Sequence, residues 1–271
     1  MSELAKVARI PRSSYYYHAK RQSAIDKYGH AKSKIEDIFN NNYGRYGYRR
    51  ITAALHEQGI GLNHKTVQRL MKALGLYCAV RLKKYRSYKG SCSSNVAPNL
   101  LNRNFVATRP NEKWVTDITE IKLCGKKIYL SPILDLYNGE VISYNISYHP
   151  KFTQVTDMLI KAFQKIPDGT SLILHSDQGW QYHMEVYQSM LRERGIRQSM
   201  SRKGNCYDNA VMENFFGLMK SELLYLTEFS SPENFIQELH HYIHYYNFHR
   251  SKSCLKYQSP VNYRLMHSQV A

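Results

Sequence analysis

The chain has 271 residues, of which 43% are hydrophobic and 13% aromatic, and this composition is typical of a globular protein. No apolar run approaches the ~18 residues of a membrane-spanning helix, and the N-terminal stretch MSELAKVARIPRSS lacks the apolar segment of a signal peptide. Five widely spaced cysteines without a C-x-x-C pair argue against a disulfide framework or a cysteine zinc site, so we expect a reduced, cytosolic protein.

The net charge of +17 is concentrated near the N-terminus. Up to Pro110 the chain holds 21 Lys and Arg against 5 Asp and Glu, whereas from Asn111 onward it holds 17 against 16. A basic segment joined to a balanced one indicates a part that binds a polyanion and a part with another task. A basic domain that is merely soluble is the alternative interpretation.

Two helices around a tight turn are predicted between residues 45 and 76. The first is expected over residues 48–58, and the second begins after Asn63, a residue well suited to cap a helix N-terminus. Inward-facing positions of the pair are Ile51, Ala54, Leu55, Val67, Leu70, Met71 and Leu74. The outward-facing positions of the second helix are Lys65, Gln68, Arg69 and Lys72. This pattern resembles a helix-turn-helix, so we expect residues 1–80 to bind DNA through those four side chains. A helical hairpin that only packs would have the same pattern.

Residues 81–112 are rich in Lys, Arg, Ser, Asn and Pro and show no sustained hydrophobic period. We interpret them as a basic linker that lies along a phosphate backbone.

The pattern changes at Lys113. Strands are predicted over residues 113–123, 126–138 and 139–148, joined as hairpins, with an Asn-Gly turn before the third. Helices and strands then alternate, with helices over 153–166 and 184–195, strands over 171–179 and 196–201, and a further helix within 201–223. This order predicts a mixed α/β layered fold.

Three carboxylates occupy unusual positions in these elements. Asp117 lies within the first strand, Asp177 follows the buried run Leu172-Ile173-Leu174, and Glu213 lies on the polar side of the last helix. At 100° per residue, the helix has an apolar arc made of Val211, Met212, Phe215, Leu218, Met219 and Leu223. Glu213 faces away from this arc and has Lys220 on its own side. Glu213 alone could be an ordinary solvated residue, and Asp177 alone a turn or helix cap. Taken together, the three carboxylates indicate a metal site, because sites made only of oxygen ligands select hard cations such as Mg²⁺ or Mn²⁺.

The spacing of these residues is similar to that in a known protein family. WVTDIT, then HSDQG, then a Glu separated from the second Asp by 35 residues resemble the DDE core, the ribonuclease H-like domain of retroviral integrases and many transposases. Within that class, RPNEKWVTDIT, HSDQGWQY, SRKGNCYDNAVMENFFGLMKSEL and YIHYYNFHRSKSCLKYQSPVNY resemble the bacterial insertion sequence three family. These matches cover residues 109–263, and the helix-turn-helix region fits the N-terminal part of that family.

The resemblance implies a ribonuclease H-like catalytic core over residues 113–225, with a mixed sheet flanked by helices, and a C-terminal helical extension over 226–271. It implies that Asp117, Asp177 and Glu213 bind Mg²⁺ or Mn²⁺, with two ions expected, and that Lys220 contacts DNA near the scissile phosphate. Further candidate DNA contacts are Arg202, Lys203 and Arg250, although Ser251-Lys252 departs from the family pattern after Arg250.

The activity implied is metal-dependent cleavage and strand transfer at the ends of an insertion sequence, through a circular intermediate, in the nucleoid of a bacterium. A homo-oligomer on terminal-repeat and target DNA is implied, as is fusion to the product of an upstream frame that supplies a leucine zipper. Two alternatives stay open. One is a ribonuclease H-like nuclease without strand transfer, and the other is a helix-turn-helix regulator, which would leave residues 113–225 without a task.

Overall fold

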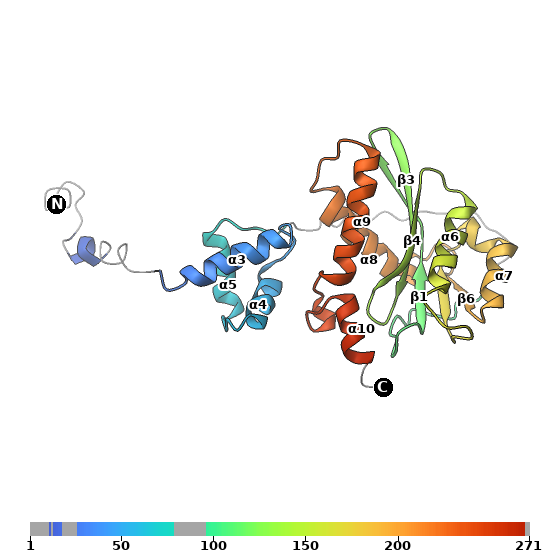
Figure 1. Ribbon diagram of the computed structural model, residues 1–271, viewed down its shortest axis with the longest axis horizontal. Helices are drawn as coiled ribbons and strands as arrows, with labels where there is room; N and C mark the ends of the chain where they lie inside the picture. Colours follow the sequence, from blue (N-terminus) through green and yellow to red (C-terminus); the bar gives the residue numbers. More distant parts are fainter. Residues whose placement is uncertain (1–10, 12, 18–25, 79–95, 269–271) are drawn as a thin grey trace. The chain divides into compact units, whose positions relative to one another are not determined.

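The computed structural model describes residues 11, 13–17, 26–78 and 96–268. It divides the chain into two compact units, Met1–Cys78 and Ala79–Ala271, each with a hydrophobic core of its own (Figure 1). Among the described residues, every helix is too short or too polar to cross a lipid bilayer. The division into four segments drawn from the sequence remains a prediction.

The first unit is a bundle of short helices. It contains α3 (Gly29–Asn41), α4 (Tyr48–Glu57) and α5 (His64–Ala73) around the fully buried side chains of Ile35, Ile51, Leu55 and Val67. The Asn63 side chain accepts a hydrogen bond from the backbone N–H of Lys65 at 2.9 Å and so caps α5. The predicted pair of helices is therefore confirmed, and α3 completes their core.

The second unit is built on a six-stranded mixed sheet. Its strands are β1 (Lys113–Thr116), β2 (Thr119–Leu123), β3 (Lys126–Asp135), β4 (Val141–Ser147), β5 (Ile173–Ser176) and β6 (Arg197–Met200). The order is β2-β3-β1-β5-β6, with β4 on the other side of β3. The pairs within β1–β4 are antiparallel, whereas β1–β5 and β5–β6 are parallel. The predicted mixed α/β fold is confirmed.

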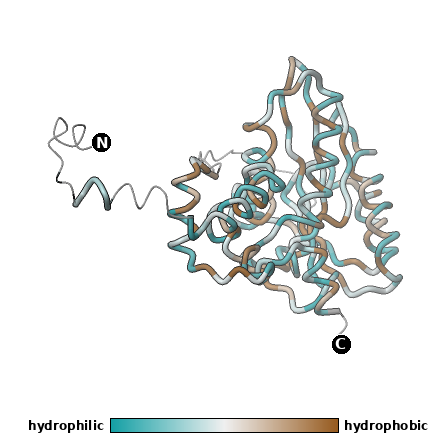
Figure 2. The backbone as a smooth tube through the Cα atoms, turned by 60° about the vertical axis from the view of Figure 1, so that its left-hand side comes forward, coloured by the Kyte–Doolittle hydropathy of each residue, from teal (hydrophilic) through white to brown (hydrophobic). Residues whose placement is uncertain are grey.

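Helices cover both faces of this sheet (Figure 1). One face packs against α6 (Phe152–Phe163) and α7 (Glu185–Glu193), with Trp114 at its centre. The other face packs against α8 (Ala210–Met219) and α9 (Pro232–Phe248), with Val115 at its centre. Trp114 and Val115 are neighbours on β1, so the alternation of a strand sends one to each core. In Figure 2 hydrophobic stretches run through the strands of the sheet, between these two helical layers.

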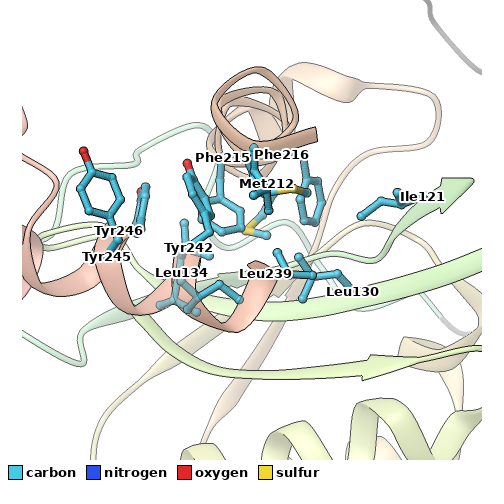
Figure 3. Close-up of a cluster of buried hydrophobic side chains, with 14 of the residues drawn as sticks. Ile121, Leu130, Leu134, Met212, Phe215, Phe216, Leu239, Tyr242, Tyr245 and Tyr246 are labelled. Carbon is cyan, nitrogen blue, oxygen red and sulfur yellow. The ribbon is translucent and has the colours of Figure 1, made fainter. Parts of the chain in front are cut away.

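The apolar side of α8 packs into the core that contains Val115. Met212, Phe215 and Met219 are buried, as the helical periodicity predicts, and Phe216 is buried beside them (Figure 3). Directly after α8, residues Lys220–Leu224 form a π-helical turn, closed by a hydrogen bond from the Tyr225 N–H to the Lys220 carbonyl at 2.9 Å. The chain continues through α9 to α10 (Pro260–Ser268).

Residues 96–112, the second half of the predicted basic linker, pack against the sheet. Leu101 is only 2% exposed and belongs to the core beneath α8, and the Leu100 N–H donates to Ser199 Oγ at 2.9 Å. The Asn111 N–H donates to Asp135 Oδ2 at 2.7 Å. This half of the segment is therefore part of the second unit, because its backbone donors are satisfied by side chains of the sheet. Residues 81–95 lie outside the described part of the chain.

Candidate active site

The two aspartates lie at the ends of neighbouring parallel strands. β1 and β5 pair so that Val115 lies opposite His175, and each aspartate follows two residues later in its chain. Asp117 and Asp177 therefore leave the same edge of the sheet side by side. This is the edge at which open α/β sheets present ligand-binding residues. Each carboxylate is fixed by a local backbone donor, Ile118 N–H to Asp117 Oδ1 at 2.7 Å and Gly179 N–H to Asp177 Oδ1 at 2.9 Å.

Burial opposes the ionisation of both aspartates, and at Asp117 the charge of Asp177 adds to this effect. The pKa of Asp117 is raised well above its usual value, first by burial and then by the charge of Asp177. Glu213 raises it further, while Ile118 N–H and Lys220 act in the opposite direction. The pKa of Asp177 is also raised by burial. Two adjacent carboxylates in this state need a positive charge to ionise together.

Glu213 stands beside this pair on α8. It lies in the first turn of that helix, is exposed, and has a pKa raised by partial burial. Its charge acts on Asp117, which places the two groups within electrostatic reach. In the described part of the chain no three His, Cys, Asp or Glu side chains come together closely enough to hold a metal ion. Glu213 is thus a neighbour of the aspartates without completing a ligand set with them.

Lys220 lies at the edge of the same group. It is the first residue of the π-helical turn, and its Nζ donates to Thr119 Oγ1 at 3.0 Å. Burial lowers the pKa of Lys220, and the charge of Asp117 opposes that effect. A half-buried ammonium beside a carboxylate group can hold an anionic oxygen close to it.

The basic residues of the loop before α8 have different surroundings. Lys203 is exposed, whereas the guanidinium of Arg202 is bound by both carboxylate oxygens of Asp208, at 2.9 and 3.0 Å. The Arg202 side chain remains 52% exposed. Both stay predicted DNA contacts, and Arg202 would need to share its charge with Asp208.

Arg250 does not have the surroundings of a DNA contact. It is 3% exposed and pairs with Glu222, with Nε to Oε2 at 2.8 Å and Nη2 to Oε1 at 2.7 Å. The Tyr242 hydroxyl donates to the same carboxylate at 3.1 Å. The prediction that Arg250 binds DNA is therefore wrong, because its guanidinium is buried inside the second unit and paired with Glu222. Lys252 Nζ likewise turns inward, to the Gly139 carbonyl at 3.2 Å.

The predicted contacts of the first unit all lie on one helix. Lys65, Gln68, Arg69 and Lys72 are all exposed on α5. The Arg69 guanidinium lies over the Tyr28 ring at 5.7 Å. Their contact with DNA stays a prediction.

Three polar residues next to the carboxylates were not singled out from the sequence. Asp208 and Asn209 are buried just before α8, and His175 is buried just before Asp177. In the sequence, Asp208 and Asn209 lie in a polar turn, NCYDN, and His175 lies on a predicted buried strand. Both features are common in proteins and do not by themselves indicate a special role.

Comparisons with known proteins agree with this arrangement. Models described as integrase core domains match residues 107–206 and 213–267, and a model of an HTH-like domain matches residues 29–84. The transposase candidate InsK of insertion sequence element IS150 from Escherichia coli is 53% identical over 97% of this chain and 93% of its own length. A transposase candidate of IS1353 from Shigella flexneri is 38% identical, over 94% of this chain and 50% of its own length.

A further relative comes from the insertion sequence three group itself. The transposase InsF of IS3A from Escherichia coli is 33% identical, over 85% of this chain and 81% of its own length. The chain therefore belongs to the family of insertion-sequence transposases with an integrase core domain that includes those of IS150 and IS3.

Proposed function

We propose that this transposase cleaves DNA at the ends of an insertion sequence and joins the freed strands, with Asp117, Asp177 and Glu213 as its catalytic metal ligands. The observation that carries the proposal is the pair of adjacent aspartates at the ends of β1 and β5, whose pKa values are both raised. Such a pair is unfavourable in isolation and favourable around a cation. Residues placed this way are more often functional than structural.

The donor set fits a hard divalent cation. All three candidate ligands are carboxylates. Oxygen-only sites select Mg²⁺ or Mn²⁺. Two such ions, held by Asp117, Asp177 and Glu213, would supply positive charge that stabilises a reacting phosphodiester. Glu213, exposed in the first turn of α8, has the freedom to turn toward the aspartates when that charge is present.

The chain's own cations would orient the DNA. Lys220 Nζ lies beside Asp117, so it would hold a phosphate oxygen next to the reacting bond. Lys203 and Arg202 would contact the strand beyond it, and the exposed residues of α5 would bind terminal-repeat DNA. Hydrolysis would leave a 3′-hydroxyl, and in-line attack by that hydroxyl on a second phosphodiester would join the strands. The family resemblance implies a circular intermediate.

Conservative substitutions test the triad. Asp117→Asn, Asp177→Asn and Glu213→Gln should each abolish cleavage and joining of terminal-repeat DNA while DNA binding stays intact, because each removes one charge at nearly constant volume. Asp157→Asn, an exposed carboxylate on α6, is the matched control and should keep full activity. More than a few per cent of activity in a triad variant would exclude that residue from the site.

Pre-cleaved ends separate this proposal from the two alternatives. A transposase joins an end that already carries a 3′-hydroxyl, whereas a nuclease without strand transfer cuts DNA and joins nothing. A helix-turn-helix regulator would bind the same DNA and show no metal-dependent product.

We also propose that the active assembly is a homo-oligomer on DNA that includes the product of an upstream reading frame. The IS1353 relative matches this chain over only half of its own length, which is the size relation that such a fusion would have. Comparing this chain with an in-frame fusion, by band shift and joining on terminal repeats, tests the idea. Equal end selectivity of the two would refute it.

A further inference from the structure

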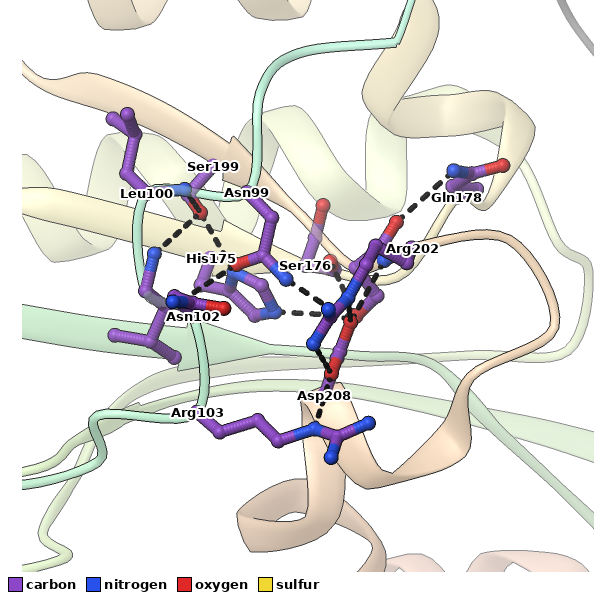
Figure 4. Close-up of polar contacts among 12 residues, drawn as sticks. Asn99, Leu100, Asn102, Arg103, His175, Ser176, Gln178, Ser199, Arg202 and Asp208 are labelled. Carbon is purple, nitrogen blue, oxygen red and sulfur yellow. Dashed lines mark hydrogen bonds and ion pairs between the residues drawn. The ribbon is translucent and has the colours of Figure 1, made fainter.

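Asp208 is the centre of a buried polar network. Its side chain has no exposed surface, although it lies on the short 3-10 turn Cys206–Asn209 at the start of α8. It accepts hydrogen bonds from Asn99 Nδ2 at 3.0 Å, from Arg103 Nε at 2.8 Å, and from the backbone N–H and the guanidinium of Arg202 (Figure 4). One carboxylate thus joins the loop before α8 to the segment that contains Asn99 and Arg103, which is more than a hundred residues earlier in the sequence.

The network continues to the residue that precedes Asp177. The Ser201 N–H and Oγ both donate to the Ser176 carbonyl, at 2.9 and 3.2 Å, and Ser201 is the neighbour of Arg202. His175 lies between Ser199 Oγ at 2.8 Å and Ser201 Oγ at 3.1 Å. Ser199 in turn accepts the N–H groups of Leu100 and Leu101, next to Asn99.

The network also reaches the residue that precedes Asp117. Asn209 follows Asp208, is 4% exposed, and its Nδ2 donates to the Thr116 carbonyl at 3.3 Å. α8 begins at the next residue and carries Glu213 in its first turn. The polar network therefore borders all three carboxylates of the proposed triad, at Thr116, at Ser176 and at the start of α8.

We infer that Asp208 is a positioning residue that holds the start of α8 beside the two aspartates, so that the Glu213 side chain can turn toward a divalent metal ion bound there. The inference rests on the proposed triad. Asp208 does not touch the reacting groups, and it acts through Asn209 and the first turn of α8. A carboxylate is required at this position because it must face two guanidinium groups at once, and a neutral amide accepts from only one oxygen.

Metal affinity measures this role directly. Asp208→Asn in the full chain should weaken Mn²⁺ binding, followed by electron paramagnetic resonance or calorimetry, by about tenfold, the lower end of the effect of removing a residue that orients metal ligands. Cleavage should fall at low Mn²⁺ and recover at high Mn²⁺, and binding of terminal-repeat DNA should not weaken, because Arg202 keeps its charge. A role in folding alone would not shift the Mn²⁺ concentration that gives half-maximal cleavage.

Glu140→Gln is the matched control. Glu140 is another buried carboxylate paired with an arginine, Arg264 at 2.7 Å, and it lies at the opposite end of β1 from Asp117. Its loss should destabilise the second unit without changing Mn²⁺ affinity. If Asp208→Asn destabilises too strongly to be purified, Asn209→Ala, which removes only the bond to Thr116, decides the question by the same measurements.

A double-mutant cycle with Glu213→Gln separates the inference from the proposal on which it rests. If Asp208 acts through Glu213, adding Asp208→Asn to Glu213→Gln should cause no further loss of Mn²⁺ affinity. An equal loss in both backgrounds, or no loss beyond that of Glu140→Gln, would overturn the inference and leave the triad intact. Unchanged Mn²⁺ affinity in Asp117→Asn and Glu213→Gln would instead overturn the proposed function.

Discussion

The buried pair between Arg250 and Glu222 provides a quantitative test of the structure. Arg250→Ala would remove the guanidinium that pairs with the Glu222 carboxylate, whose side chain is 10% exposed and also accepts a hydrogen bond from the Tyr242 hydroxyl. Removing one partner of a buried ion pair typically costs ~3–5 kcal/mol, because the other charge stays buried without compensation. That loss is a large fraction of the ~5–15 kcal/mol by which a domain is stable.

Tryptophan fluorescence during urea unfolding measures this loss in the correct unit, because the two tryptophans of the chain, Trp114 and Trp180, both lie in the second unit. The double variant Arg250→Met with Glu222→Leu should recover most of the stability, since it removes both charges. Below the unfolding transition, Arg250→Ala should bind DNA as well as the unmodified chain does. A change in unfolding free energy below ~1 kcal/mol, together with weakened DNA binding, would refute this account and restore Arg250 as a DNA contact.

Three further predictions concern the triad and the first unit. Without divalent metal, Asp117→Asn should raise the melting temperature at neutral pH. The pKa of Asp117 is raised in the folded state, so the folded chain binds more protons than the unfolded chain between the two pKa values. The stability of the unmodified chain therefore falls as pH rises through that interval, and the variant avoids this loss. The same variant measured in EDTA at pH 4 should show a smaller gain, and a loss at pH 7 would contradict the reasoning. Asn63→Ala should destabilise the first unit by about 1 kcal/mol in thermal unfolding followed by circular dichroism, because α5 loses its cap; no change would show that the cap contributes nothing. Lys65→Ala should lower the slope of log affinity against log salt by about 0.9 if its ammonium meets a phosphate, whereas Gln68→Ala should leave that slope unchanged; equal slopes for both would remove Lys65 from the interface.

Much of the fold follows from patterns that are local in the sequence. The stripe through Val67, Leu70 and Met71 and the cap at Asn63 predict α5 to within a residue of its observed start, because capping and periodicity act within one or two turns. The position of Asp177 directly after a short apolar run predicts a carboxylate at the end of a buried strand. The spacing of the three carboxylates resembles a family, and relatives confirm that family.

What the sequence did not predict depends on partners far away along the chain. Arg250 looks like a surface cation until Glu222, 28 residues earlier, is placed against it in the core. Leu101 stands in a polar segment, and its burial depends on Ser199 accepting the neighbouring N–H groups. Asp208 looks like a turn residue because its partners Asn99 and Arg103, more than a hundred residues earlier, are brought to it by the tertiary structure. In each case the free energy comes from a non-local contact that no periodicity records.

The break between β1 and β2 shows how two unfavourable residues can compensate each other. Asp117 interrupts what would otherwise be a single strand beside β3, since Thr116 pairs with Ile133 and Thr119 pairs with Leu130. The residues of β3 that face the gap include Pro132, which has no N–H to donate and is normally excluded from the middle of a sheet. Its carbonyl accepts a hydrogen bond from Thr116 Oγ at 2.9 Å, so the gap leaves this backbone group satisfied. The proline removes the cost of interrupting the ladder at that point, and the interruption turns the Asp117 carboxylate out of the strand toward Asp177.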